Sequence, residues 1–481
     1  MAGGDPVSDE LACLECDKAK DECGVFGIYG PGKNVSRITY FGLHALQHRG
    51  EESSGVAVAG GKIEVHKGMG LVTEVFDDDI LNRLQGDIGI GHVRYSMKSN
   101  SVINAQPQVF RYPWGMVALA YNGNLTNSTD LMEDLSRKGV IFQSISNTEI
   151  MANLLARHYE GDIEEALRKV TCEIQGAYSL VVMTQNKLIG LRDPFGIRPL
   201  CLGDLDGSFV LASESCALNT VGAEFIRNIS PGEMVAIDGG GLKSTSLTNN
   251  NRQAPCVFEY VYLARPDSTI DDINVNIARF GFGKQLAQEN KVDADVVVGV
   301  PYSGTTAALG YAQERGLPFM EGLIKNRYVG RTFIQPSQKL RDLRVRLKLN
   351  PVKEILEGKS IVMVDDSIVR GTTSRKIVKM VREAGARKVH FVVSCPPIAH
   401  PCYYGIKTTS RDELIASRRN VEEIRHHIGA DSLYYLSLRG MLEVLDLPEE
   451  KVCAACFTGK YPIDVSGCRA CDNKSFSEKG C

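Results

Sequence analysis

The first half of the chain alternates short apolar runs with glycines. Runs such as Cys23–Gly30 and Ala177–Met183 have the length of buried strands and are bounded by glycine. Helical periodicity replaces this pattern near 149–160 and 162–174. The pattern predicts sheets with helices packed against them between residue 23 and about residue 246.

A polar stretch separates this half from a second half with a different pattern of strands and helices. Thr248–Gln253 has no apolar periodicity and predicts a linker. Strands and helices then alternate, which predicts parallel β-α-β units with a ligand site at the carboxyl ends of the strands. The predicted strands are Val296–Val300, Ile361–Val364 and Val389–Val393, and the predicted helices lie near 305–315 and 373–384.

Composition narrows the class of protein. Of 481 residues, 43% are hydrophobic, and 55 Lys and Arg nearly balance 58 Asp and Glu. This balance argues against a nucleic acid or a membrane surface as the main partner. The sequence has neither a run of 18 apolar residues nor a basic leader with an apolar core, so we expect a cytoplasmic protein.

The 14 cysteines are many for a reducing compartment, where disulfides are rare. Metal binding or nucleophilic chemistry explains them better, and three pairs have the two-residue spacing that can place two thiolates on one metal centre. These pairs are Cys13 with Cys16, Cys453 with Cys456, and Cys468 with Cys471. Four others lie in or beside apolar runs and are expected to be core residues. They are Cys172, Cys201, Cys216 and Cys395.

The most informative stretch is Ile361–Ser374. A short apolar strand delivers two adjacent carboxylates, Asp365 and Asp366, which suit ribose hydroxyls and Mg²⁺. A loop then places small residues at the start of a helix, where backbone N–H groups and hydroxyls suit a 5′-phosphate. These residues are Gly371, Thr372, Thr373 and Ser374. The alternative is an ordinary capped helix after an acidic turn, but the order of the four features favours a sugar-phosphate site.

This stretch resembles the phosphoribosyl pyrophosphate loop of type I phosphoribosyltransferases. Lys325–Pro336, Ala264–Ser268 and Ala454–Pro462 narrow the resemblance to the amidophosphoribosyltransferase family, the glutamine enzymes of purine synthesis. The resemblance runs from about Cys23 to about Pro462. It implies a fold of mixed α/β and α+β class, in which an N-terminal-nucleophile αββα glutaminase domain precedes a parallel-sheet phosphoribosyltransferase domain. The implied division is a propeptide at 1–22, the glutaminase at 23–246, a linker with the transferase at 247–462, and a tail at 463–481.

The resemblance also implies roles in the second domain. Asp365 and Asp366 would bind ribose hydroxyls and Mg²⁺, with Ser303 also serving the metal, and Gly371 to Ser374 would hold the 5′-phosphate. The loop from Lys325 to Gln335 would close over the pyrophosphate and exclude water while ammonia reacts. The family pattern Val-Pro-Asp/Glu-Ser is broken here, because Tyr302 stands at the acidic position.

The start of the first domain resembles a class II glutaminase. Cys23 precedes Gly-Val-Phe-Gly, and although a lone cysteine in such a setting is more often a core residue, three other segments also match the family. They are Gln47–Gly50, Gly91–Tyr95 and Asn122–Leu125. The resemblance makes Cys23 the nucleophile, Asn122 and the Gly123 N–H the oxyanion hole, and Arg94 the clamp on the glutamine α-carboxylate.

Such a nucleophile needs a free α-amino group, whose pKa near ~8 lets it take the thiol proton. Cleavage after Glu22 is therefore predicted, while His48 and His92 are not needed as bases and are expected to be structural.

The site also departs from the family at three positions. Met97 replaces a threonine, Tyr121 a histidine and Asn147 an aspartate. Asn147 would then bind the glutamine α-ammonium without a charge-assisted contact worth roughly 1–3 kcal/mol.

Cys256, Cys402, Cys453 and Cys456 fall where cluster-containing family members hold a [4Fe–4S] centre, so the resemblance implies a structural cluster. The alternative is a zinc ribbon made by the pairs 453/456 and 468/471, although the gap between the pairs is short. Cys13 and Cys16 lie in the segment expected to be removed. Family precedent adds a homotetramer inhibited by purine nucleotides.

Two other functions remain open. The first is a nucleotide-sensing regulator whose glutaminase has decayed, an idea that Met97, Asn147 and Tyr302 support. The second is a transferase that uses ammonia only. The acidic pair and the Lys325–Gln335 loop favour an enzyme, and the sequence has no basic stripe that would suit a nucleic-acid regulator.

Overall fold

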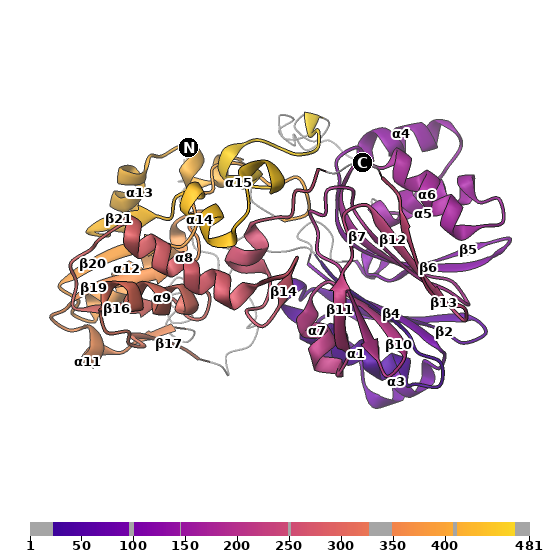
Figure 1. Ribbon diagram of the computed structural model, residues 1–481, viewed down its shortest axis with the longest axis horizontal. Coiled ribbons are helices and arrows are strands. Elements are labelled where there is room, and N and C mark those ends of the chain that lie inside the picture. The colour runs from indigo at the N-terminus through magenta and orange to yellow at the C-terminus, as the bar shows by residue number, and fades with distance from the viewer. Residues whose placement is uncertain are drawn as a thin grey trace, which may run out of the picture.

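A computed structural model of the chain describes residues 23–95, 101–144, 146–248, 252–326, 349–406 and 411–466. Two lobes lie side by side (Figure 1), the first coloured indigo to magenta and the second rose through orange to yellow. Several residues discussed above lie outside the described parts. They are residues 1–22, Met97, the loop beyond residue 326, Cys468 and Cys471.

The first lobe contains two stacked antiparallel sheets. In order, the seven-stranded sheet contains β11 (Glu224–Asn228), β9 (Cys201–Leu205), β10 (Ser208–Ala212), β1 (Cys23–Tyr29), β4 (Ile88–Arg94), β2 (Ser53–Ala59) and β3 (Ile63–Met69). The six-stranded sheet contains β13 (Gly241–Ser246), β12 (Glu233–Asp238), β8 (Leu188–Arg192), β7 (Gly176–Met183), β6 (Gly115–Leu125) and β5 (Gln108–Tyr112). A buried cluster including Val25, Ile90 and Val181 fills the space between them, because alternate strand residues point to opposite faces.

Helices cover both outer faces of this pair of sheets. On the first sheet lie α1 (Val35–Ala45), α2 (Val72–Val75), α3 (Asp78–Arg83) and α7 (Ser215–Val221). On the second lie α4 (Ser128–Arg137), α5 (Asn147–His158) and α6 (Ile163–Glu173). Short 3₁₀ turns occur at η1 (Gln47–Arg49) and η2 (Val102–Asn104). The layers are therefore αββα, as predicted.

One aromatic stack stands at the edge of the second sheet. Trp114, the chain's single tryptophan, lies in the turn between β5 and β6. Its ring stacks on Tyr112 with centroids 4.5 Å apart and on Tyr159 with centroids 3.7 Å apart. Both faces of the indole are thus covered by rings of its own lobe.

The second lobe is built on a parallel four-stranded sheet. Its order is β16 (Val296–Gly299), β19 (Ser360–Asp365), β20 (Lys388–Val393) and β21 (Ser432–Tyr435), with every neighbouring pair parallel. Around it lie α8 (Val275–Glu289), α9 (Thr305–Arg315), α11 (Lys353–Leu356), α12 (Thr372–Glu383), α13 (Val421–Ile428), α14 (Leu438–Leu445) and α15 (Ala455–Thr458). Two small hairpins are β14 (Thr269–Ile270) with β15 (Ile273–Asn274), and β17 (Leu323–Lys325) with β18 (Leu349–Pro351). The irregular turns are the π-helical η3 (Glu259–Leu263) and the 3₁₀ turns η4 (Arg411–Glu413), η5 (Ile415–Ser417) and η6 (Glu449–Lys451).

The predicted helices and strands of both halves are present, with ends shifted by no more than two residues. The expectation for Cys172 was wrong, because this residue is exposed on α6, whereas Cys201, Cys216 and Cys395 are buried as expected. Cys172 lies beside an apolar run but on the solvent side of an amphipathic helix. No helix in the described ranges is long and apolar enough to cross a membrane.

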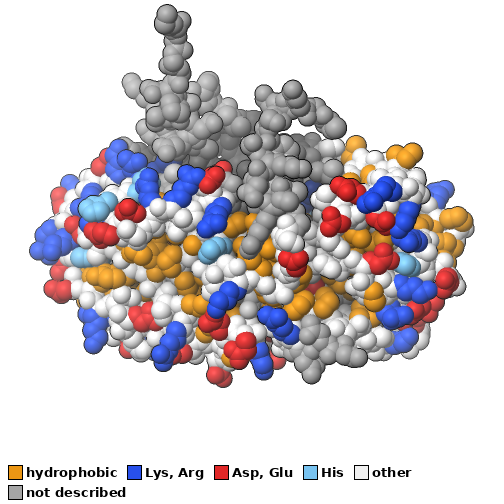
Figure 2. All heavy atoms as spheres, turned by 90° about the horizontal axis from the view of Figure 1, so that it is seen from above, with side chains coloured by type: hydrophobic (Ala, Val, Ile, Leu, Met, Phe, Trp, Pro, Cys, Tyr) orange, Lys and Arg blue, Asp and Glu red, His pale blue; other side chains and the backbone are white. Residues whose placement is uncertain are grey.

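The two lobes share buried contacts. The hydrophobic core of the second lobe includes Ala177 and Ile197 from the first. Arg49 of the first lobe contacts Glu259 of the second through Nη2 at 2.7 Å, and both side chains are buried. Away from this interface, acidic and basic side chains are intermingled over the face seen in Figure 2.

Candidate active sites

The acidic pair of the second lobe lies where the central strand ends. Asp365 is the last residue of β19 and is 1% exposed, and Asp366 is fully buried. The Ser303 hydroxyl lies 3.4 Å from an Asp365 carboxylate oxygen, and the Ser367 hydroxyl donates to Asp366 at 2.6 Å. The structure thus brings together the three residues predicted to serve ribose and Mg²⁺, which suits oxygen-ligated cations and hydroxyl donors.

The helix that follows the pair offers an anion site. Gly371 is the left-handed N-cap of α12, and Thr372, Thr373 and Ser374 form the first turn. This turn contains no acidic side chain of its own that would offset the positive end of the helix dipole. The N–H groups and hydroxyls predicted to hold a phosphate therefore stand together at one helix end. We call the stretch Asp365–Ser374 the phosphate site.

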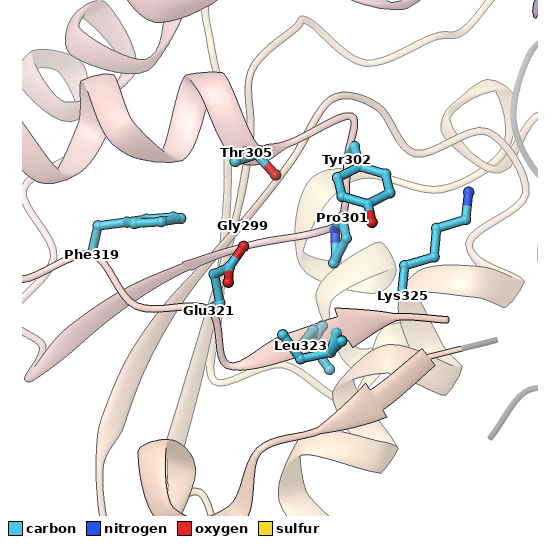
Figure 3. Close-up of a pocket in the computed structure, with 9 residues that line it drawn as sticks. Gly299, Pro301, Tyr302, Thr305, Phe319, Glu321, Leu323 and Lys325 are labelled. Carbon is cyan, nitrogen blue, oxygen red and sulfur yellow. The ribbon is translucent and has the colours of Figure 1, made fainter. Parts of the chain in front are cut away.

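Tyr302 and Lys325 lie near this site, because both line a cleft together with Thr373. The Lys325 ammonium lies 5.8 Å from the centre of the Tyr302 ring, a cation–π arrangement. In Figure 3 the two side chains stand next to each other beside a pocket of about 120 Å³. Where family members have a carboxylate, this chain places an aromatic face against the lysine.

A larger cleft, of about 310 Å³, is lined by both lobes. The first lobe contributes His48, and the second contributes Ser303, Lys325 and Thr373 among others. His48 was expected to be only structural, so its place at this cleft was missed by sequence reasoning.

The same cleft is lined by Arg279, which was also missed. Arg279 is buried on α8 and donates to the carbonyls of Tyr260 and Ala264 at 2.9 and 2.7 Å. Burial lowers the pKa of Arg279, while the Asp366 carboxylate opposes this shift. A guanidinium therefore supplies positive charge near the acidic pair. The signal in the sequence was an arginine flanked by the apolar residues Ile277, Ala278 and Phe280.

The predicted nucleophile lies at the start of the first strand. Cys23 opens β1, is 6% exposed and pairs across the sheet with Arg94 at the end of β4. The Arg94 guanidinium donates to the Asn104 carbonyl at 2.6 Å, which fixes it beside the strand ends. The nucleophile and the predicted carboxylate clamp are therefore neighbours.

The predicted oxyanion hole contains an unsatisfied amide. Asn122 is fully buried, and neither its side-chain nitrogen nor its oxygen has a hydrogen-bond partner among the described residues. A buried polar group without a partner costs about 1–3 kcal/mol, which a substrate oxyanion would offset. The next residue, Gly123, has φ +138°, and a Cβ there would collide with the Ala177 carbonyl oxygen. Only glycine fits this strand bend.

Each of the two histidines of this region has a hydrogen-bond or ion-pair partner. Burial lowers the pKa of His92 to about 3, with Arg94 and Lys67 adding to the effect, and its Nε2 bonds the Tyr121 carbonyl at 3.0 Å. His48 lies 2.6 Å from the buried Glu214 carboxylate. His92 therefore stays neutral near pH 7 and joins β4 to β6.

Tyr121 and Asn147, two of the three positions that depart from the family pattern, lie next to each other. The Asn147 side-chain nitrogen donates to the Tyr121 hydroxyl at 3.4 Å and to the Asn124 side-chain oxygen at 3.2 Å. The group expected to meet the glutamine α-ammonium is thus a neutral amide held by other neutral groups. We call Cys23, Arg94, Asn122, Gly123 and Asn147 the amide site.

The four cysteines at 256, 402, 453 and 456 lie close together in the second lobe. Cys256 and Cys453 form a parallel bridge, in which Val257 N–H donates to the Cys453 carbonyl at 3.2 Å. Burial raises the pKa of Cys453 to about 12, and the charge of Cys402 adds to it. Burial also raises the pKa of Cys456, with Cys256, Cys453 and Cys402 acting in the same direction.

Among the described residues, no three His, Cys, Asp or Glu side chains are close enough to hold one metal ion. A four-iron cluster binds each thiolate through a different iron, so its ligands stand farther apart than those of a single ion. Cys256 and Cys453 are buried, Cys402 and Cys456 are half-buried, and all four are free of disulfides, so they are the kind of residues that a cluster would use as ligands. The zinc ribbon stays a prediction, because Cys468 and Cys471 lie outside the described residues.

Comparison with known proteins agrees with this architecture. Residues 92–220 match the glutamine amidotransferase domain model, and residues 277–418 match the phosphoribosyl transferase domain model. The amidophosphoribosyltransferase of Bacillus subtilis is 51% identical over 92% of this chain and 95% of its own length. That of Archaeoglobus fulgidus is 50% identical over 92% of this chain and 99% of its own length. The solved B. subtilis enzyme complexed with ADP and GMP superposes with a TM-score of 0.88 at 50% identity, over 92% of this chain and 98% of that one.

Fold, sites and domain models define a class: a glutamine amidotransferase joined to a phosphoribosyltransferase. Within this class, the chain shares high identity over nearly its whole length with amidophosphoribosyltransferases. The chain belongs to the amidophosphoribosyltransferase family.

Proposed function

We propose that the protein converts glutamine, phosphoribosyl pyrophosphate and water to 5-phosphoribosylamine, glutamate and pyrophosphate, the first committed step of purine synthesis. The observation that carries this proposal is the cleft lined by both lobes, because it places the amide-site lobe beside the phosphate site. Ammonia released in the first lobe would then be used in the lobe directly beside it.

In the first lobe, the Cys23 thiol would lose its proton to its own α-amino group and attack the glutamine amide carbon. The Asn122 amide and the Gly123 N–H would stabilise the oxyanion, and Arg94 would orient the substrate. The α-amino group returns the proton to the leaving ammonia, and water then hydrolyses the thioester to glutamate. Cleavage after Glu22 is required, and mass spectrometry of active protein that still begins at Met1 would rule it out.

In the second lobe, ammonia would attack the anomeric carbon of the sugar as pyrophosphate leaves. Asp365 and Asp366 would hold the ribose hydroxyls, the first turn of α12 the 5′-phosphate, and Lys325 the pyrophosphate. Mg²⁺, bound near Ser303 and the acidic pair, would neutralise charge on the pyrophosphate. Burial of both carboxylates beside a hydroxyl supports this cation site.

The cluster, the inhibitors, the location and the oligomeric state are each proposed from a single line of support. A [4Fe–4S] cluster at Cys256, Cys402, Cys453 and Cys456 would tie the C-terminal segment to the lobe interface, and iron and sulfide analysis against zinc analysis tests it. Inhibition by purine nucleotides is proposed because a solved relative is complexed with ADP and GMP. A cytoplasmic homotetramer follows from family precedent, and sedimentation would test the oligomeric state.

A second candidate is an ammonia-dependent transferase. The neutral contacts of Asn147 favour it, because the glutamine α-ammonium would find no carboxylate there. Pyrophosphate release measured with glutamine and then with ammonium separates the two. Turnover with both supports the proposal, turnover with ammonium alone supports the second candidate, and turnover with neither overturns both.

A further inference from the structure

A segment of the second lobe lies directly behind the predicted oxyanion hole. Gly405 has φ +116°, and a Cβ placed on it would be 2.9 Å from the Gly123 Cα and 3.0 Å from the Gly123 carbonyl carbon. Two backbones from different lobes are therefore in contact with no side chain between them. Gly405 therefore limits how far the backbone that carries the Gly123 N–H can move toward the second lobe.

A hydrogen bond fixes the same segment to the next residue of the strand. The Asn124 side-chain nitrogen donates to the Tyr403 carbonyl at 3.0 Å, and its oxygen accepts from Asn147 at 3.2 Å. Asn124 thus joins the second lobe to a residue of the amide site. Its amide orientation is set from both sides.

The segment is itself held firmly. The buried Arg198 guanidinium donates to the Tyr404 carbonyl at 3.1 Å. The buried Tyr404 hydroxyl donates to the Ile463 carbonyl at 2.7 Å and accepts from the Ile463 N–H at 2.9 Å. A support that positions another group must resist displacement, and these bonds meet that requirement.

We propose that Tyr403–Gly405, a backbone segment of the phosphoribosyltransferase lobe, positions the oxyanion hole of the glutaminase lobe. None of its atoms reacts with glutamine, so these are positioning residues. The inference rests on the proposed glutaminase function and deepens it: amide hydrolysis depends on a part of the lobe that uses the ammonia.

The kinetic consequence is specific. The negative oxygen exists only in the transition state and the tetrahedral intermediate, so a displaced Gly123 N–H lowers kcat for glutamine and leaves KM nearly unchanged. A misplacement of about 1 Å or a lost donor lowers such rates by roughly 10- to 100-fold or more. Ammonium-supported turnover bypasses the oxyanion and should be unchanged.

The first test is Gly405→Ala in the full chain. The added methyl would press on Gly123 and lie 2.6 Å from the Arg198 guanidinium. Glutamine kcat should fall at least tenfold while pyrophosphate release with ammonium stays at the wild-type rate. Gly385→Ala is the matched control, since Gly385 also has a positive φ, +96°, but a Cβ there meets only Glu357. It should leave both activities unchanged.

The second test is Asn124→Asp, which keeps the shape of the side chain but replaces the donor to the Tyr403 carbonyl with a negatively charged oxygen that repels it. It decides the matter if Gly405→Ala does not fold. Glutamine kcat should fall several-fold, and the γ-aldehyde analogue of glutamine, captured by Cys23 with its oxygen in the same hole, should bind more weakly by a similar factor. Wild-type glutamine kcat in the folded variants, or an equal loss with glutamine and ammonium in Asn124→Asp, would overturn the inference.

The proposed function fails in a different way. If the wild-type protein neither hydrolyses glutamine nor captures the aldehyde while ammonium still supports turnover, then the glutaminase proposal falls and this inference falls with it. If the wild type does both and the variants match it, only the inference falls.

Discussion

The phosphate site is made by one continuous stretch of chain, whereas the amide site is assembled from three strands and a helix. Asp365 to Ser374 are brought together by a single strand, loop and helix. Cys23, Arg94 and Asn122 meet only because β1, β4 and β6 pack in two sheets. A local site depends on local geometry, but an assembled one depends on the packing of its whole lobe and, as proposed, of the neighbouring lobe.

The sharpest separation of the two sites should come from Cys23→Ala. Removal of the nucleophile should lower glutamine-dependent turnover by roughly 10³-fold or more, since no other group can form the thioester. Ammonium-supported turnover should persist, because the phosphate site is untouched. Pyrophosphate release with each nitrogen donor is the measurement, and survival of glutamine turnover would contradict the role of Cys23.

Asp366→Asn should impair the phosphate site and leave the amide site intact. Loss of the buried carboxylate should lower turnover with either donor by roughly 10²-fold or more, because both routes use the same sugar. Glutamine hydrolysis measured alone should continue. Asp293→Asn, an exposed position in the same lobe, is the control and should behave as wild type.

Acid should destabilise the protein through His92. This side chain is neutral when folded, with a pKa of about 3, but has a pKa of 6.5 when unfolded. The unfolded chain therefore binds a proton that the folded chain does not, so stability is lost as pH falls from 6.5 towards 3. Between pH 7 and pH 5 this effect lowers the free energy of unfolding by about 2 kcal/mol.

Urea unfolding at the two pH values would measure this in wild type and in His92→Gln. The variant should lose about 2 kcal/mol less than wild type on acidification. The exposed His426→Gln serves as control. Equal pH dependence in His92→Gln and wild type would show that the fold does not lower the pKa of His92.

The smallest of these effects should come from Asn147→Asp. A carboxylate would restore a charge-assisted contact with the glutamine α-ammonium and lower the glutamine KM by about tenfold. The Tyr121 hydroxyl, which now accepts from Asn147, can donate to it instead. Asn153→Asp on the same helix is the control. An unchanged KM would mean that the α-ammonium binds elsewhere.

The contrast between the sites also explains what could be predicted from the sequence. The places of the acidic pair at a strand end and of Gly371–Ser374 at a helix start were predicted from the sequence, because these features follow one another along the chain, while their binding roles stay predictions. Both layers of the first lobe and the parallel sheet of the second followed from apolar periodicity and from the resemblance.

What was missed depends on contacts between distant segments. Arg279 enters the cleft from α8, and His48 enters it from the other lobe, so no local pattern marks either. The contact of Gly405 with Gly123 joins residues 282 positions apart, and sequence spacing carries no trace of it.

The aromatic stack around Trp114 gives the molecule a built-in optical reporter. Because the chain has a single tryptophan and both of its faces are covered by tyrosines of the first lobe, intrinsic fluorescence excited at the red edge reports on that lobe alone. Melting of the second lobe by itself would be silent in this signal but visible by circular dichroism. Comparing the two signals would therefore reveal whether the lobes come apart one after the other or as a single cooperative unit.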